Sequence, residues 1–159
     1  MANHYRFQRP DDDDESLGGR LENELVDICA DWFRANNDAA GFKCMSGTIM
    51  DIQQGTDATI WGMPVDFTCN FSGKDNCVKL PSEVTLEQGV TVLFGFRTGN
   101  SHHGYTKFEQ PVLVIGLRAD QEYLSSWMGH ILDKFHQKME EIIETGQKDY
   151  WDYFDSIEA

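Results

Sequence analysis

The chain has few basic residues, no long apolar run and no complete catalytic motif. Its 159 residues include 13 Lys and Arg against 27 Asp and Glu, which gives a formal charge of −14. Proteins that grip nucleic acid phosphates need clustered cations, so we expect no direct binding of nucleic acid. A chain this acidic is instead attracted to basic protein surfaces. Acidity also keeps a protein in solution, and this plainer explanation stays open.

The apolar runs are too short to cross a bilayer. Runs such as Val112 to Ile115 fall far below the roughly 20 residues that a membrane helix needs. Met1 to Pro10 is polar and lacks the apolar segment of a secretory signal. We therefore expect a cytoplasmic protein without membrane contact, whose cysteines stay reduced. A hydrophobic content of 40% and an aromatic content of 12% indicate a folded chain.

The length predicts one domain, and its charge pattern predicts an arm in front of it. Residues 1–19 contain the run Asp11-Asp12-Asp13-Asp14-Glu15, whose charges repel one another and resist burial. We expect this segment to be a flexible acidic arm. Residues 20–159 are then expected to form a single globular domain.

Hydrophobic spacing predicts a helix at each end of that domain and strands between them. The first helix has apolar residues at helical spacing at Leu21, Leu25, Ile28, Cys29, Trp32 and Phe33. The second is predicted as one long helix from Tyr123 to Ile143, ended by Gly146. Strands are predicted over Ser46–Gln53, Ala58–Trp61, Val65–Asn70, Val90–Arg97 and Pro111–Leu117. The last of these is a continuous apolar run, which is typical of a strand covered on both faces.

This order of elements predicts the fold class. We expect an α+β or α/β fold, in which a mixed central sheet is packed by the N-terminal helix and the long C-terminal helix.

One segment carries a resemblance to a known family. Gly55 to Phe71 reads GTDATIWGMPVDFTCNF, with Asp57 at the start of one predicted strand and Asp66 on the next. Glu24 lies on the preceding predicted helix. In this arrangement the chain resembles the PD-(D/E)XK nuclease superfamily. The resemblance implies that Glu24, Asp57 and Asp66 hold a divalent cation that activates water, while a lysine balances the charge.

The lysine of that family is missing, because Thr68 stands in its place. A degenerate nuclease-like core is therefore an alternative to an active nuclease. A lysine within reach of Asp66 in the folded chain would favour activity. The plainest alternative makes Asp57 a turn residue and Asp66 an outward-facing strand residue.

Cysteine and histidine side chains suggest a second kind of site. Thiolates and imidazoles are preferred zinc ligands, and the candidates are Cys44, Cys69, Cys77, His102 and His103. We predict a structural Zn²⁺ held by these cysteines and one of the two histidines. Their spacing is not the tight C-x-x-C type, so packed or incidental thiols are the alternative. Cys29 is assigned to the core because it lies on the apolar helical stripe.

Acidic residues recur near the C-terminus. Asp149, Asp152 and Asp155 fall every third residue and would form a sloping row on a helix, beside Trp151 and Phe154. Together with Asp11 to Glu15, this row is our prediction for the contacts with a basic partner. Inward packing of the tail aromatics is the alternative.

The favoured functional hypothesis is an inhibitor rather than an enzyme. A small, acidic single domain is similar in general character to phage-encoded anti-CRISPR proteins and other DNA mimics. This likeness implies a partner with a nucleic-acid-binding surface, namely the CRISPR effector nuclease of a bacterial host, whose binding to target DNA would be blocked. A metal-dependent nuclease using Glu24, Asp57 and Asp66 is the alternative. An assembly protein that oligomerises through its aromatic tail is a third hypothesis.

Overall fold

The structure is a computed structural model that describes residues 17–44, 56–69, 71, 77–97 and 111–158. The predicted acidic run and the predicted strand Ser46–Gln53 lie outside the described residues. In chain order the elements are α1 (Leu17–Ala35), the 3-10 helix η3 (Ala39–Gly41), β1 (Phe42–Cys44), β2 (Ala58–Ile60), β3 (Met63–Thr68), β4 (Cys77–Glu87), β5 (Val90–Arg97), β6 (Val112–Arg118), α3 (Gln121–Ser126), α4 (Met128–Gln137) and α5 (Met139–Glu158).

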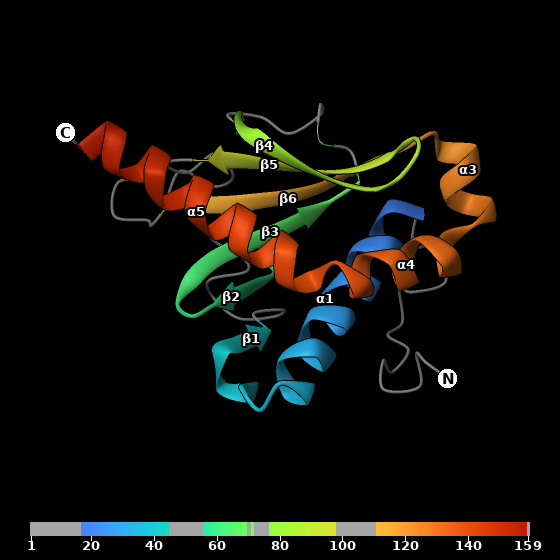
Figure 1. The fold of residues 1–159 in the computed structure, drawn as a ribbon, viewed down its shortest axis with the longest axis horizontal. Coiled ribbons are helices and arrows are strands. Elements are labelled where there is room, and N and C mark those ends of the chain that lie inside the picture. The colour runs from blue at the N-terminus through green and yellow to red at the C-terminus, as the bar shows by residue number, and fades with distance from the viewer. Residues whose placement is uncertain (1–16, 45–55, 70, 72–76, 98–110, 159) are drawn as a thin grey trace.

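Within the described residues the strands form one mixed sheet of six, in the order β1-β2-β3-β6-β5-β4 (Figure 1). The pairs β1–β2 and β2–β3 are antiparallel, β3 and β6 run parallel, and β6–β5 and β5–β4 are again antiparallel. Mixed strands and packed helices confirm the α+β class. β6 is buried from Val112 to Leu117, as its continuous apolar run predicts.

Helices cover one face of this sheet, and the other face carries the buried charged residues Asp66 and Arg97. Side chains alternate along each strand, so Phe94 of β5 and Leu113 of β6 point to the face where α5 packs. The alternate residues of these strands point to the opposite face, which we call the second face. It comprises Asp66 and Thr68 of β3, Val112, Val114 and Gly116 of β6, and Leu93, Gly95 and Arg97 of β5. Within the described residues no helix has the length and apolarity needed to span a membrane.

The C-terminal region differs from the single helix that we predicted. Its pattern is divided into α3, α4 and α5, which are separated at Trp127 and Lys138. Gly146 does not end a helix, since α5 continues to Glu158. An ideal Cβ on Gly146 would lie 2.8 Å from Phe94 Cε1 and 3.2 Å from a Leu113 methyl carbon. The glycine is thus needed for the close approach of α5 to the sheet.

The strand β4 was not predicted from the sequence. Its side chains are partly exposed along most of its length, and Pro81 lies within it. A register irregularity between Lys79 and Glu83 accommodates this proline at the edge of the sheet.

The packing role of Gly146 can be tested with Gly146→Ala. The added methyl group would press on the buried ring of Phe94, so we expect a loss of about 1–3 kcal/mol in the free energy of unfolding. The matched control is Gly129→Ala in α4, where no neighbouring atom of the described chain lies within 4 Å of the ideal Cβ. The control should gain up to ~1 kcal/mol from helix propensity. Urea unfolding followed by circular dichroism measures both, and equal effects would contradict close packing at Gly146.

Candidate functional site

The β2–β3 hairpin brings Asp57 and Asp66 together. Its register pairs Ala58 with Val65, so Asp57, one residue earlier, lies opposite Asp66. Asp57 is anchored there by the backbone, since its N–H donates to Val65 O at 2.9 Å and its Oδ2 accepts from Phe67 N at 2.8 Å. The two carboxyl groups hydrogen-bond to each other. Asp57 is therefore a half-buried part of a polar cluster and not a plain turn residue.

The cation that faces Asp66 is an arginine. Arg97 Nη2 lies 3.7 Å from Asp66 Oδ2, and the two residues are only 2% and 5% exposed. β6 lies between β3 and β5, so the long side chain of Arg97 reaches across β6 on the second face. Asp66 is thus buried, which corrects the interpretation of an outward residue in solvent. The position of the family lysine is taken by Thr68, which is also buried.

The glutamate close to this pair is Glu22 and not Glu24. Glu22 Oε2 accepts a hydrogen bond from Cys69 N at 3.3 Å, just past the carboxyl end of β3, and its charge acts on Asp57. Glu24 follows two residues later on α1, about 200° further around the helix. The prediction named Glu24 on this helix, whereas the contacts with Cys69 and Asp57 described here come from Glu22.

Asp57 holds a proton at neutral pH. Burial raises the pKa of Asp57 to about 9, and the hydrogen bond to Asp66 and the negative charges of Asp66 and Glu22 act in the same direction. Only the N–H of Phe67 opposes them. The protonated carboxyl of Asp57 therefore donates to Asp66, whose charge is balanced by Arg97. The cluster is a chain of three groups, Asp57–Asp66–Arg97, with Glu22 beside it.

The donor atoms of this cluster fit a hard divalent cation. Mg²⁺ is held in proteins by one or two carboxylates together with water and substrate phosphates, and Asp57 and Asp66 supply two adjacent carboxyls. The raised pKa of Asp57 reflects repulsion from neighbouring carboxylates, which a cation would relieve by replacing the proton of Asp57. Among the described residues no group of three or more His, Cys, Asp and Glu side chains is arranged to hold a metal ion. Glu22 is accordingly not assigned as a direct ligand.

The zinc prediction is changed by the strand order. Cys44 ends β1 and Cys77 begins β4, which are opposite edges of the sheet. Five strand spacings separate them by about 24 Å, whereas two sulfur ligands of one zinc lie within about 4.6 Å of each other. One zinc ion therefore cannot bind both. Cys69 is half-buried. Burial raises the pKa of its thiol, and the negative charge of Glu22 raises it further. His102 and His103 lie outside the described residues, so a zinc that uses them stays a prediction.

The C-terminal acids divide into buried and exposed positions on α5. Asp149 is 8% exposed, and its Oδ2 accepts from Ser82 N at 2.9 Å, which ties α5 to β4. It is therefore not available for a partner, in contrast to our prediction. Asp152 and Asp155 are exposed, and so is Trp151 at 40%. The predicted contacts Asp11 to Glu15 lie outside the described residues.

Two members of the cluster were missed from the sequence. Arg97 is the only charged residue of the apolar strand β5, and this is the signal that could have identified it. Glu22 had no such signal, because α1 carries several acids and the helical pattern does not rank them.

The proton on Asp57 gives a pH dependence that can be measured. The unfolded chain releases this proton near the ordinary pKa of about 3.9, so the native state is the more protonated one between about pH 4 and pH 9. Stability should therefore fall as pH rises through this window, by up to about 1.4 kcal/mol per pH unit. Asp57→Asn keeps the acceptor for Phe67 N–H and a donor for Asp66 but cannot ionise. We expect its urea-unfolding profile to be flatter than that of the wild type, and a wild-type profile of the same slope would contradict the assignment.

Comparison with known proteins gives no further guide to this site. No family model, no curated protein and no solved structure matches the chain. Its function has to be inferred from its own residues and their geometry.

Proposed function

We propose that the chain is a metal-dependent phosphodiesterase acting on nucleic acid, with its site at Asp57 and Asp66. The observation that carries this proposal is the meeting of these two carboxyls on one hairpin, with a cation, Arg97, at Asp66. A cation at that position is what an active site resembling the PD-(D/E)XK type requires, and arginine supplies the charge that the missing lysine would bring. This ranks the nuclease above the inhibitor.

Each side chain has a distinct part in this proposal. Asp57 and Asp66 would hold the divalent cation, which when bound would stabilise negative charge on the phosphate and activate a water molecule for attack. Arg97 balances the charge of Asp66 and holds that side chain in place across β6. Glu22 is positioned by α1 and by its bond from Cys69 N, and its charge acts on Asp57. Arginine stays protonated at all relevant pH values, so Arg97 is not assigned as a base.

The overall charge sets the conditions under which activity should be sought. A chain with a charge of −14 repels long nucleic acids, so we expect weak substrate binding that depends on divalent ions. A short single-stranded DNA at high protein concentration is the suitable substrate.

Cleavage of such a DNA in Mg²⁺ or Mn²⁺ tests the proposal. Asp57→Asn and Asp66→Asn should each lower the rate by about 100-fold or more, the size typical for loss of one group that stabilises the transition state. Glu22→Gln should have a smaller effect, of about tenfold, because Glu22 contributes only its negative charge beside the cation. Glu24→Gln is the matched control, because it makes the same charge change on the same helix and should leave the rate unchanged.

Metal binding can be followed without any substrate. Because Asp57 is protonated in the free protein, binding of Mn²⁺ should release a proton, which calorimetry in buffers of different ionisation enthalpy detects. Folded wild-type protein that neither cleaves DNA nor takes up Mn²⁺ would contradict the proposal.

A second candidate, the acidic inhibitor, is favoured by one feature of α5. Asp152 and Asp155 are exposed beside Trp151, and an exposed Trp flanked by charge is typical of residues that dominate binding to a partner. Glu140, Glu141 and Glu144 of the same helix line a shallow hollow of about 430 Å³. This surface suits a basic groove, such as the nucleic-acid channel of a CRISPR effector nuclease.

This candidate is tested by adding the protein to a guide-loaded effector nuclease and measuring target DNA binding by fluorescence anisotropy. If α5 makes the contact, Trp151→Ala and Asp155→Lys should weaken inhibition by about tenfold or more, and added salt should weaken it further. Glu122→Lys on α3 changes the net charge equally at another exposed position and should keep inhibition. Equal losses for Asp155→Lys and Glu122→Lys would show that only net charge matters, against a specific surface.

A further inference from the structure

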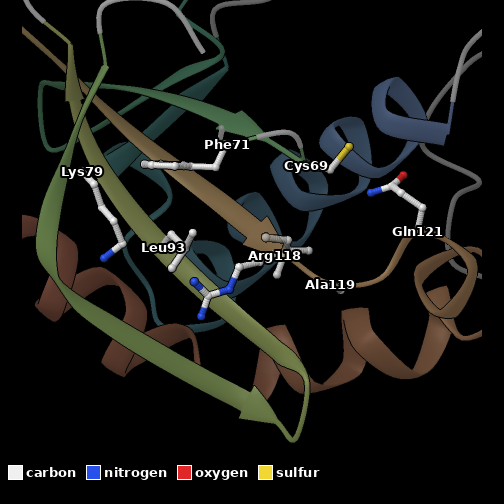
Figure 2. Close-up of a pocket in the computed structure, with 8 residues that line it drawn as sticks. Cys69, Phe71, Lys79, Leu93, Arg118, Ala119 and Gln121 are labelled. Carbon is white, nitrogen blue, oxygen red and sulfur yellow. The ribbon is translucent and has the colours of Figure 1, made fainter. Parts of the chain in front are cut away.

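The second face of the sheet also contains a pocket that is separate from the carboxyl cluster. It has a volume of about 380 Å³ and lies where the parallel strands β3 and β6 end (Figure 2). Its lining includes Cys69, Phe71, Lys79, Leu93, Arg118 and Gln121. Ligands in sheets with parallel strands bind preferentially beyond the carboxyl ends of those strands. The volume is within the range of small-molecule sites.

Phe71 forms an aromatic wall of this pocket. An ideal Cβ on Gly95 would lie 2.6 Å from Phe71 Cζ, and one on Gly116 would lie 2.6 Å from Phe71 Cδ1. The ring therefore lies directly against the backbone of β5 and β6, and any larger residue at either glycine would displace it. The ring is only partly exposed, and Leu93 extends the apolar surface beside it (Figure 2). A fixed aromatic ring of this kind is a stacking platform for a nucleobase.

Two cations stand at the same pocket. Lys79 of β4 and Arg118 of β6 point to one side of it together with Leu93 (Figure 2). Both are paired with Glu83, at 3.2 Å from Lys79 Nζ and 3.8 Å from Arg118 Nη2. All of these side chains are more than a third exposed, so solvent weakens the two ion pairs. A phosphate group, with more charge and more acceptor oxygens than a carboxylate, would compete well for the same cations.

We propose that this pocket binds one nucleotide, with the base on Phe71 and the phosphate at Lys79 and Arg118. Phe71, Leu93 and the two cations line one hollow (Figure 2), which offers an apolar surface and a charged group to the two halves of a nucleotide. Gln121 adds an amide that can hydrogen-bond to the edge of a base.

The position of the pocket connects it to the carboxyl cluster. Arg118 follows four residues after Val114, which pairs with Asp66, so the phosphate end of the pocket lies about 13 Å along the strand from Asp66. Phe71 lies nearer, against Gly95 and Gly116, and Gly95 pairs with Val114. This arrangement places the pocket beside the proposed point of cleavage, with its aromatic wall toward Asp66 and its cations further along the face. In this role, which rests on the proposed function, it holds a nucleotide that flanks the phosphate at Asp57 and Asp66.

The binding experiment uses thymidine 5′-monophosphate in EDTA, so that neither a metal nor cleavage is involved. Titration followed by calorimetry should give saturable binding, which Arg118→Gln, Lys79→Gln and Phe71→Ala each weaken by about fivefold or more. Arg34→Gln is the matched control, since Arg34 is also an exposed arginine paired with one acid, at 64% exposure against 59% for Arg118. Glu83→Gln should tighten binding, because it removes the carboxylate that competes with the phosphate.

Thymidine and inorganic phosphate serve as probes for the two halves. Each should bind more weakly than the nucleotide, with thymidine sensitive to Phe71→Ala and phosphate sensitive to Arg118→Gln. Absence of nucleotide binding to folded protein, or equal loss in Arg118→Gln and Arg34→Gln, would overturn the proposal. Nucleotide binding without metal-dependent cleavage would keep the pocket and reject the proposed function. Metal-dependent cleavage without nucleotide binding would keep the proposed function and reject the pocket.

Discussion

The charges buried on the second face constrain the centre of this fold. β6 is apolar on both faces, and the strands on either side of it each carry one buried charged residue, Asp66 on β3 and Arg97 on β5. A buried charge without a partner costs several kcal/mol, and these two side chains pair with each other across β6. This pairing ties the register of β3 to that of β5 through the strand between them. The hairpin that carries Asp57 is then held in place by the same charges.

In the carboxyl cluster, the folded protein favours a neutral Asp57, whereas the proposed chemistry requires Asp57 to be ionised. Asp57 is kept neutral because its burial and the neighbouring acids oppose its charge. The neighbouring carboxylates that make ionisation of Asp57 unfavourable would favour a bound divalent cation. The cation would offset the repulsion between the carboxylates, which the proton on Asp57 now reduces. A carboxyl group whose pKa is strongly raised by burial and by a neighbouring charge is typical of functional sites. Here the backbone contacts of Asp57 supply the rigidity that such a site needs.

Glycines let side chains approach the sheet closely on both of its faces. On the helical face, Gly146 allows α5 to lie against Phe94 and Leu113. On the second face, Gly95 and Gly116 allow Phe71 to lie against the backbone. The first contact builds the hydrophobic core, whereas the second shapes the wall of a pocket. The sheet thus separates a face that stabilises the fold from a face that carries both proposed sites.

Local patterns in the sequence determined much of this structure. Spacings within a few residues predict the apolar stripe of α1 and the apolar runs of β5 and β6. They also predict that Asp57 lies at the start of one strand and Asp66 on the next, because backbone geometry alone sets these positions. Tertiary structure decided the rest. Contacts between distant segments bring Glu22 to the end of β3 and let Arg97 reach Asp66 across β6. They also place Cys44 and Cys77 at opposite edges of the sheet and let α5 continue past Gly146, which packs against Phe94. The proton on Asp57 depends on burial, which no short stretch of sequence specifies, because it arises only when the strands and α1 pack around the carboxyl group.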